Sequence, residues 1–294
     1  MQDYIFSIEI QNAVTNPLLG DLSILPNLMS LHLQYGNKID FHEPSKAITS
    51  SFNGMQSSDA TSLALALKSM RSLCSLSLTN SQIDDDLVRL FVGELNRHDD
   101  SKSLHIRDTL IDLDLSHNKI TTEGLRLITK CFLQEGFDDE ESTILATLKL
   151  VGNSIRAEGA RTLARLLKTN NSLVTLDVRM NRLEDEGGKL LVDGLWHNKN
   201  LKNLSLSSNS LSSLSITSLC KVLENSQSLV EVIDLSCNQF LEADYVRLAS
   251  TVKESSRLLS LDLRENYDVN ENDAKSKVVQ DALNTINESL KIAV

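Results

Sequence analysis

Residues 110–120 read LIDLDLSHNKI, and the same pattern returns as LATLKLVGNSI at 145–155, LVTLDVRMNRL at 173–183 and LKNLSLSSNSL at 201–211. Altered copies follow as VEVIDLSCNQF at 230–240 and LLSLDLRENYD at 258–268. Each copy keeps one asparagine, and successive asparagines lie 35, 28, 28, 29 and 28 residues apart. Six copies at nearly constant spacing indicate a chain built from structural repeats.

The pattern within one copy predicts its local structure. The central L-x-L is a short strand whose leucines point inward while the intervening residue faces solvent. The asparagine stands where the chain turns, and its amide can donate and accept hydrogen bonds to backbone groups of adjoining turns. The second half of each repeat returns as a helix, as predicted for 59–69, 157–170 and 185–198 from the spacing of apolar residues.

A helix between successive strands makes the strands parallel. The predicted fold class is therefore α/β, a leucine-rich-repeat solenoid of the ribonuclease-inhibitor-like horseshoe type, with a parallel concave sheet and convex helices. Weaker copies begin at Ile5, Leu28 and Leu73, which makes nine strands. We expect an N-terminal capping segment over 1–27, repeats over 28–268 and a C-terminal capping helix over 269–294, where apolar residues recur at helical spacing.

The composition excludes some classes of partner. The formal net charge of −11 argues against binding nucleic acid or an anionic membrane, which both require clustered Lys and Arg. The four cysteines show no paired spacing, so we expect free thiols in a reducing compartment. The N-terminus carries Asp3 and Glu9 around its apolar residues, so no signal peptide is predicted and the expected location is the cytoplasm.

The sequence offers no chemistry of a catalytic kind. The six histidines lack ligand spacing, and the nucleophile-elbow, phosphate-loop and dinucleotide motifs are absent. We therefore expect no enzyme activity, no metal and no cofactor. Trp196, at the end of a predicted helix, is interpreted as core filling rather than as a ligand platform.

The outward positions of the strands are the expected binding surface. Asp177, Asp234 and Asp262 occupy one such position, and Arg179 and Arg264 occupy the next. Asp234 and Asp262 should be adjacent like charges, which a basic or mixed-charge partner segment would compensate. Two alternatives stay open: Arg264 could compensate within the chain, or aspartate is simply a solvated residue of this repeat.

Two repeats carry extra segments, at 98–108 and 133–143. Both lie between a helix end and the next strand, so we expect them to project together from one edge and to contact a partner. Arg97, Lys102 and Arg107 lie in or directly before the first segment and the second carries four successive acidic residues, and the candidate partner-binding residues are Arg107, Asp138, Asp139, Glu140 and Glu141.

The order of the atypical segments carries a resemblance to a known family. LPNLMSLHLQYGNKIDF at 25–41 comes first and LLSLDLRENYDVNENDAKSKVVQDAL at 258–283 comes last. With the repeats between them, the chain resembles the T-complex-associated testis-expressed protein family, that of dynein regulatory complex subunit 5 in motile cilia, over roughly residues 25–285. The resemblance implies a non-catalytic scaffold subunit of the nexin–dynein regulatory complex in the cytoskeleton of the ciliary or flagellar axoneme. Its implied partners are a second leucine-rich-repeat protein and coiled-coil subunits.

Two other regulatory classes use similar repeats. A Ran-type GTPase-activating protein characteristically ends in a long acidic run, whereas this sequence ends NESLKIAV. The sensor region of a NOD-like receptor would accompany a nucleotide-binding domain with a phosphate loop, which this sequence lacks.

Overall fold

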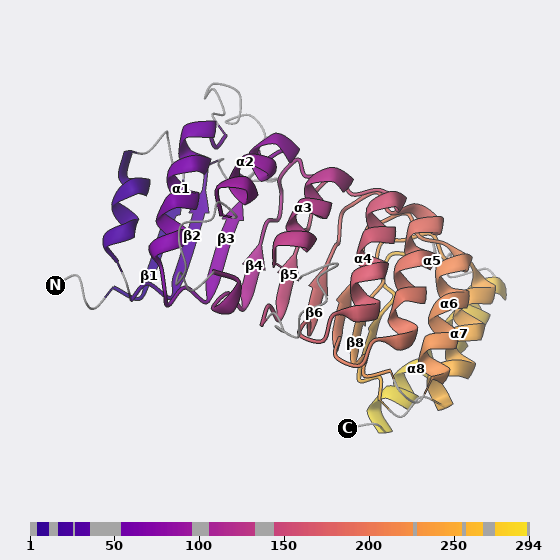
Figure 1. Cartoon of the computed structure of the whole chain (residues 1–294). Helices are drawn as coiled ribbons and strands as arrows, with labels where there is room; N and C mark the ends of the chain where they lie inside the picture. The colour runs from indigo at the N-terminus through magenta and orange to yellow at the C-terminus, as the bar shows by residue number, and fades with distance from the viewer. Residues whose placement is uncertain are drawn as a thin grey trace. The chain divides into compact units, whose positions relative to one another are not determined.

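The computed structural model describes residues 5–11, 17–25, 27–35, 54–95, 106–132, 144–225, 228–254, 257–266 and 274–292. The chain forms two compact units, Met1–Asn153 and Ser154–Val294. In each unit, strands alternate with helices along the chain, and the helices lie in a layer on one face of the strands (Figure 1).

The first unit holds five of the nine strands. Its elements are β1 (Ser7–Gln11), η2 (Pro17–Ile24), β2 (Ser30–Gln34), α1 (Ser57–Ser69), β3 (Ser75–Thr79), α2 (Asp85–Leu95), η4 (Ile106–Asp108), β4 (Asp112–Asp114), α3 (Thr122–Phe132) and β5 (Thr147–Lys149). The strands are parallel and follow chain order, with Leu31, Leu76, Leu113 and Leu148 in register across β2 to β5. These four leucines are at most 1% exposed, so the core consists of stacked leucine layers.

The second unit repeats this arrangement with shorter strands. Its elements are α4 (Ala157–Thr169), β6 (Thr175–Asp177), α5 (Glu184–Gly194), η5 (Leu195–His197), β7 (Asn203–Ser205), α6 (Ser213–Glu224), β8 (Val232–Asp234), α7 (Glu242–Glu254), β9 (Ser260–Asp262) and α8 (Ala274–Ile292). The predicted helices are present, with ends that differ by a few residues. In α8, Val279, Ala282 and Ile286 are buried, as their spacing predicts.

The repeat asparagines form a hydrogen-bonded ladder at the turns that follow the strands. In the first unit, Asn118 accepts from the N–H groups of Ser81 and Ile83 through Oδ1, each at 3.0 Å. Its Nδ2 donates to the carbonyls of Leu78 and Leu115 at 2.7 and 2.9 Å. One side chain therefore satisfies backbone groups of its own turn and of the preceding turn, which confirms the role predicted for it.

The same ladder continues within the second unit. Asn238 accepts from the N–H groups of Asn209 and Leu211, and its Nδ2 donates to the carbonyls of Leu206 and Leu235. Asn209 departs from the pattern, because its buried Oδ1 has no hydrogen-bond partner among the described residues. In the preceding repeat, Leu183 has the backbone conformation of a right-handed helix. The N–H group of the following residue, Glu184, donates to the backbone carbonyl of Asn209 rather than to its side chain.

A second row of asparagines, which the sequence analysis missed, closes the opposite ends of the repeats. Asn170 and Asn198 follow helices α4 and α5 and are 7% and 5% exposed. Asn198 Oδ1 accepts from the N–H groups of Asn200 and Leu201, while its Nδ2 donates to the carbonyl of Leu167. This side chain thus joins the end of α4, in the preceding repeat, to the residues that lead into β7.

The ladder positions are those of the six repeat asparagines and of Ser81, and the residue before each of them has a left-handed backbone conformation. Its φ is positive at Asn80, His117, Gly152, Met180, Ser208, Cys237 and Glu265. The sharp turn brings the ladder side chain back under the strand ends, and a left-handed conformation is unfavourable for residues other than glycine. Only Gly152 meets the requirement with a glycine.

Trp196 corrects a prediction. It lies in η5, directly after α5, and its side chain is 43% exposed. The helix it was assigned to ends at Gly194, and the following turn directs Trp196 outward while Leu195 fills the core at 0% exposure.

We predict that Asn181→Ala lowers the free energy of unfolding more than Asn203→Ala does. Asn181 is buried, accepts from the N–H of Ile155 at 3.1 Å and donates to the carbonyl of Val178 at 3.0 Å. Asn203 is half-buried, and its Nδ2 donates to a side-chain oxygen, Thr175 Oγ1. Each backbone group left unpaired costs ~1–3 kcal/mol. Urea denaturation of both variants measures the difference, and equal losses would contradict the buried-ladder argument.

Two glycines should respond oppositely to alanine. Gly152 has φ +63°, and an added Cβ would lie 2.6 Å from His117 Nδ1, so Gly152→Ala should lower the melting temperature. Gly93 is exposed within α2, with open space around its missing Cβ. Gly93→Ala should raise the free energy of unfolding by up to ~1 kcal/mol through helix propensity. Thermal melting followed by circular dichroism tests both, and a shift of the same sign in the two variants would refute the assignment.

Candidate interaction surface on the sheet

The outward face of the second unit's strands carries the residues singled out from the sequence. Leu176 and Val178 point into the core and are 0% exposed, so Asp177 and Arg179 lie on the opposite face. The register places Asp177 beside Ser205, Ser205 beside Asp234, and Asp234 beside Asp262. The predicted row is therefore formed, and Asp234 and Asp262 are neighbours as expected.

Each aspartate of this position has a local structural role. The Oδ1 atoms of Asp177, Asp234 and Asp262 accept from the N–H group two residues further along the chain, at 3.2, 3.0 and 3.0 Å. Asp114 of the first unit does the same with Ser116, at 3.0 Å. The carboxylate thereby satisfies a backbone donor where the short strand ends, as aspartates commonly do in turns. This contact explains the repeated aspartate without a partner.

Arg179 neutralises two of the carboxylates. Its Nε and Nη2 bind Asp177 in a forked arrangement, with Nη2 2.7 Å from Oδ2. Its Nη1 lies 4.0 Å from Asp234 Oδ2. The hydrogen bond to Asp177 raises the pKa of Arg179 above its ordinary value, although burial opposes the shift. The Asp177 side chain is only 9% exposed, so little of this carboxylate is left for a ligand.

Arg264 holds Asp262 in the same forked way. Its Nε and Nη2 both donate to the carboxylate, and these hydrogen bonds lower the pKa of Asp262. The Arg264 side chain is 83% exposed, whereas that of Asp262 is 25% exposed. The internal compensation that the sequence left open is thus present, and the repulsion between Asp234 and Asp262 does not by itself require a basic partner.

Two serines complete this surface and were not among the predicted site residues. Ser236 Oγ donates to Asp234 Oδ1 at 2.7 Å and lies 3.0 Å from Ser207 Oγ. The second unit therefore presents a network of three carboxylates, two guanidinium groups and two hydroxyl groups. Serine recurs at the second outward position of the repeats, as Ser116, Ser207 and Ser236, and this recurrence was the feature of the sequence that could have identified them.

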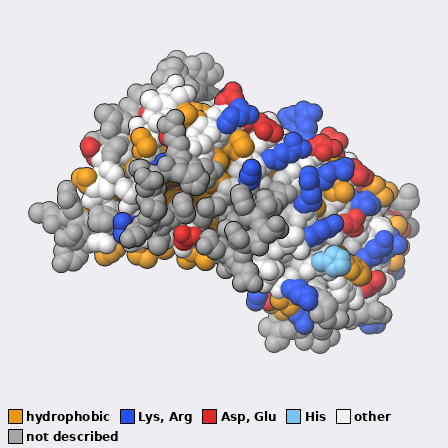
Figure 2. All heavy atoms as spheres, viewed as in Figure 1, with side chains coloured by type: hydrophobic (Ala, Val, Ile, Leu, Met, Phe, Trp, Pro, Cys, Tyr) orange, Lys and Arg blue, Asp and Glu red, His pale blue; other side chains and the backbone are white. Residues whose placement is uncertain are grey.

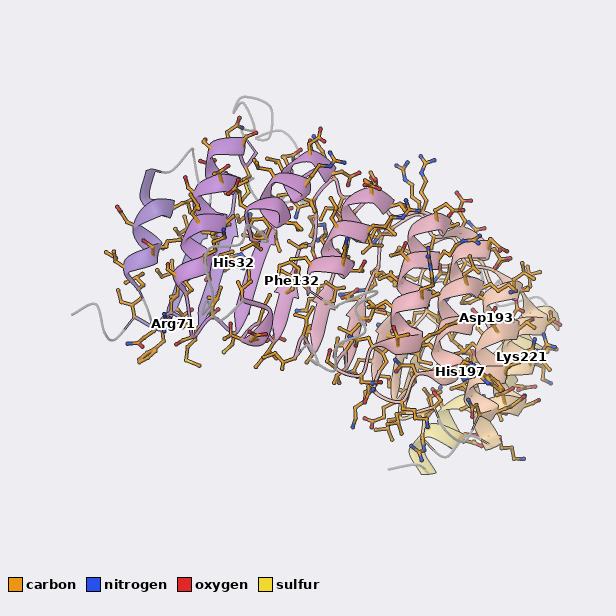
Figure 3. All side chains as sticks on the ribbon, viewed as in Figure 1. His32, Arg71, Phe132, Asp193, His197 and Lys221 are labelled. Atoms are coloured by element: carbon orange, nitrogen blue, oxygen red, sulfur yellow. The ribbon has the colours of Figure 1, made fainter. Side chains whose placement is uncertain are left out.

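The equivalent face of the first unit is chemically different. Its outward residues are in register as His32, Ser77, Asp114 and Lys149, and Figure 3 labels His32 on β2. No salt bridge joins these four residues to one another within the described part of the chain. Among the described residues, the network of forked Asp–Arg pairs therefore lies in the second unit.

The candidate residues of the two extra segments cannot be placed in the same way. Residues 133–143 lie outside the described residues, which include no part of the acidic set Asp138, Asp139, Glu140 and Glu141. The same holds for 98–105 and for the side chain of Arg107. That the two extra segments project together from one edge therefore remains a prediction.

The chemistry that the sheet face of the second unit can offer is that of charged and polar side chains. Among the described residues, no group of three His, Cys, Asp or Glu side chains is placed to hold a metal ion. No described helix is long and apolar enough to cross a membrane. The site can offer forked guanidinium groups and partly exposed carboxylates, which recognise polar and charged groups of a protein segment.

The repeats, the register and the asparagine ladder define a leucine-rich-repeat protein. Family models described as leucine-rich repeat match residues 109–128, 169–192 and 200–222. The chain is related to ribonuclease inhibitor and to the NACHT, LRR and PYD domains-containing proteins.

Two relatives show the extent of this similarity. Mouse ribonuclease inhibitor is 32% identical over 152 residues, which cover 51% of this chain and 32% of the inhibitor. Human NACHT, LRR and PYD domains-containing protein 13 is 29% identical over 215 residues, 66% of this chain and 20% of the relative. The chain thus spans a third or less of these relatives. Among solved structures, an internalin from Listeria monocytogenes aligns over 98% of this chain with 15% identity and a TM-score of 0.40.

The Asp262–Arg264 pair predicts a pH-dependent contribution to stability. Because the folded state lowers the pKa of Asp262, the contribution is present above the ordinary aspartate pKa and is lost as pH falls through the lowered value. The melting temperatures of wild type and Asp262→Asn should therefore differ at neutral pH and converge in acid. The difference should be small, because Arg264 is exposed. A difference that does not change with pH would contradict this account.

Proposed function

We propose that this protein is a non-catalytic scaffold subunit of the nexin–dynein regulatory complex, located in the ciliary or flagellar axoneme. The observation that carries the proposal is the succession of atypical repeats at 25–41 and 258–283 around regular ones. Leucine-rich repeats are common in protein–protein interaction, and the matches to such repeats support a scaffold role independently of the axonemal assignment.

The sheet face of the second unit supports a particular kind of partner. Its aspartates are already paired with Arg179 and Arg264, so a purely basic segment would compete with these internal pairs. A mixed-charge segment could bind the outer edges of the guanidinium groups and the partly exposed Asp234 together. We therefore expect the partner, a second leucine-rich-repeat protein or a coiled-coil subunit, to present both signs of charge.

Incorporation into axonemes tests the proposal and the surface separately. Tagged wild-type protein should be enriched in salt-extracted axonemes and should be lost with other regulatory-complex subunits. Absence of wild-type protein from the axoneme would refute the cellular assignment. If Asp234→Lys with Asp262→Lys assembles as well as wild type at low and high salt, the sheet face is not the contact. An Asp114→Lys variant provides a matched control on the first unit.

Binding of a ribonuclease is a second candidate function, favoured by the 32% identity to mouse ribonuclease inhibitor. The measurement is hydrolysis of RNA by a pancreatic-type ribonuclease with this protein in excess. We expect no inhibition, because the sheet aspartates that could attract a basic enzyme are paired within the chain. Inhibition that saturates with protein concentration would favour the second candidate over the first.

A further inference from the structure

The helical face of the second unit carries a band of basic side chains. Arg161 and Arg165 lie on α4, Lys189 on α5, Lys221 on α6 and Arg247 on α7, and we call these five residues the basic band. Figure 2 shows Lys and Arg side chains gathered over α4 to α6. The band lies on the face opposite the Asp–Arg network.

The repeat length brings the members of the band into two rows that lie one helical turn apart, with Arg161 and Lys189 in one and Arg165 and Lys221 in the other. Arg161 and Lys189 are 28 residues apart, as are Arg165 and Asp193, and Asp193 and Lys221. This separation equals one repeat, so residues on neighbouring helices stand side by side. A contact confirms this alignment, since Arg247 Nη1 donates to Thr217 Oγ1 of α6 at 2.6 Å. With packed helices ~8–10 Å apart, the band from α4 to α7 is about 30 Å long.

Helix capping accounts for Lys221, which lies in the last turn of α6, but not for the other four charges of the band. Basic residues interact favourably with the helix dipole in the last turn, where Lys168, Lys221 and Lys253 already lie. Arg161, Arg165, Lys189 and Arg247 stand in the middle of their helices. Arg165 and Lys221 form no salt bridge with any described residue. Their charge is therefore available to a partner.

Four carboxylates lie within or beside the band: Asp193, Glu158, Glu186, whose charge acts on Lys189, and Glu224, which follows Lys221 on α6. Asp193 binds Lys189 Nζ at 2.8 Å, and Arg161 reaches Glu158 at 3.6 Å. Burial alone would raise the pKa of Asp193, but hydrogen bonds from Lys189 and Ser218 and the charge of Lys221 lower it. The five basic groups of the band, together with Lys168 and Lys253 in the last turns of α4 and α7, outnumber these four carboxylates and leave the surface basic, although the chain as a whole carries a net charge of −11.

An exposed aromatic side chain stands next to the band. Trp196, the only tryptophan of the chain, follows Asp193 by one turn and is 43% exposed. Asn225 Nδ2, at the end of α6, donates to the Trp196 carbonyl at 2.8 Å, which fixes this turn beside the next repeat. Figure 3 shows Asp193, His197 and Lys221 close together on this face. Tryptophan and arginine are the residues most enriched at binding hot spots.

We propose that the basic band and Trp196 bind an acidic segment of a partner protein that carries an apolar residue for the tryptophan. Charge complementarity argues for this occupant, because carboxylates of the segment can pair with Arg165, Lys221 and Arg247, which form no salt bridge with any described residue. A basic residue of the segment can meet the two carboxylates Asp193 and Glu158, which pair with Lys189 and Arg161 within the chain. A nucleic acid would set an unbroken row of phosphates against these two carboxylates, which is unfavourable. The proposal rests on the scaffold role and is independent of the axonemal assignment.

Binding can be measured directly with the intact protein. The probe is a synthetic glutamate-rich peptide with one central leucine, titrated while the fluorescence of Trp196 is recorded. We expect a saturable change in emission and an affinity that falls as salt increases. A peptide with glutamine in place of glutamate should bind about tenfold or more weakly, as expected when charge pairs are lost.

Matched variants locate the site. Arg165→Glu with Lys221→Glu should weaken binding by about tenfold or more at low salt, because both exposed cations are reversed. Arg182→Glu with Lys277→Glu makes the same change of net charge at exposed positions outside the band and should change affinity less than about twofold. Circular dichroism and thermal melting establish that both pairs are folded.

The other outcomes overturn the proposal. Equal affinity of the two double variants would place the peptide elsewhere, and equal binding of the glutamine peptide would exclude charge recognition. Tighter binding of a single-stranded oligonucleotide than of the glutamate peptide would assign the band to nucleic acid. Each result is obtained with purified protein, so failure here leaves the axonemal experiment unaffected.

Discussion

The structure depends on satisfying backbone groups that become buried wherever a short strand turns into the next segment. A strand of three residues offers few hydrogen bonds of its own, and its ends would leave buried donors and acceptors unpaired. Asn118 and Asn238 solve this problem by bonding to two successive turns at once. The left-handed residue before each ladder position and the asparagines that follow α4 and α5 are consequences of the same requirement.

The two faces of the second unit use charge differently. On the sheet, Asp177 and Asp262 bind the backbone where their strands end and are then held by forked contacts from Arg179 and Arg264. These charges mainly stabilise the end of each strand. On the helices, Arg165 and Lys221 have no comparable ion pair among the described residues. The face with the more conspicuous charge pattern in the sequence is therefore the one whose charges are largely satisfied internally.

The comparisons identify the class of repeat, whereas the structure shows which charged and aromatic side chains this chain exposes. Similarity to ribonuclease inhibitor and to the NACHT, LRR and PYD domains-containing proteins establishes the class of repeat. Surfaces of such repeats diverge readily, because outward residues contribute little to the leucine core and can change without loss of fold. The partner must therefore be sought from the charges and aromatic residues of this chain, and the axonemal role is a proposal that rests on the order of its atypical repeats.

The amino-acid sequence was enough to predict the repeat, the parallel strands, the inward leucines and the ladder asparagines, because each follows from local periodicity and from the need to pair buried backbone groups. It also placed Asp234 beside Asp262, since a constant repeat length puts equivalent positions in register. The sequence did not show how Arg179 and Arg264 pair or where Trp196 points, and both follow from the folded structure. Those outcomes depend on rotamers and on the turn after Gly194, which brings Leu195 rather than Trp196 into the core. Periodicity identifies the side of an element that a residue occupies, but the neighbouring repeat determines which atoms that residue contacts.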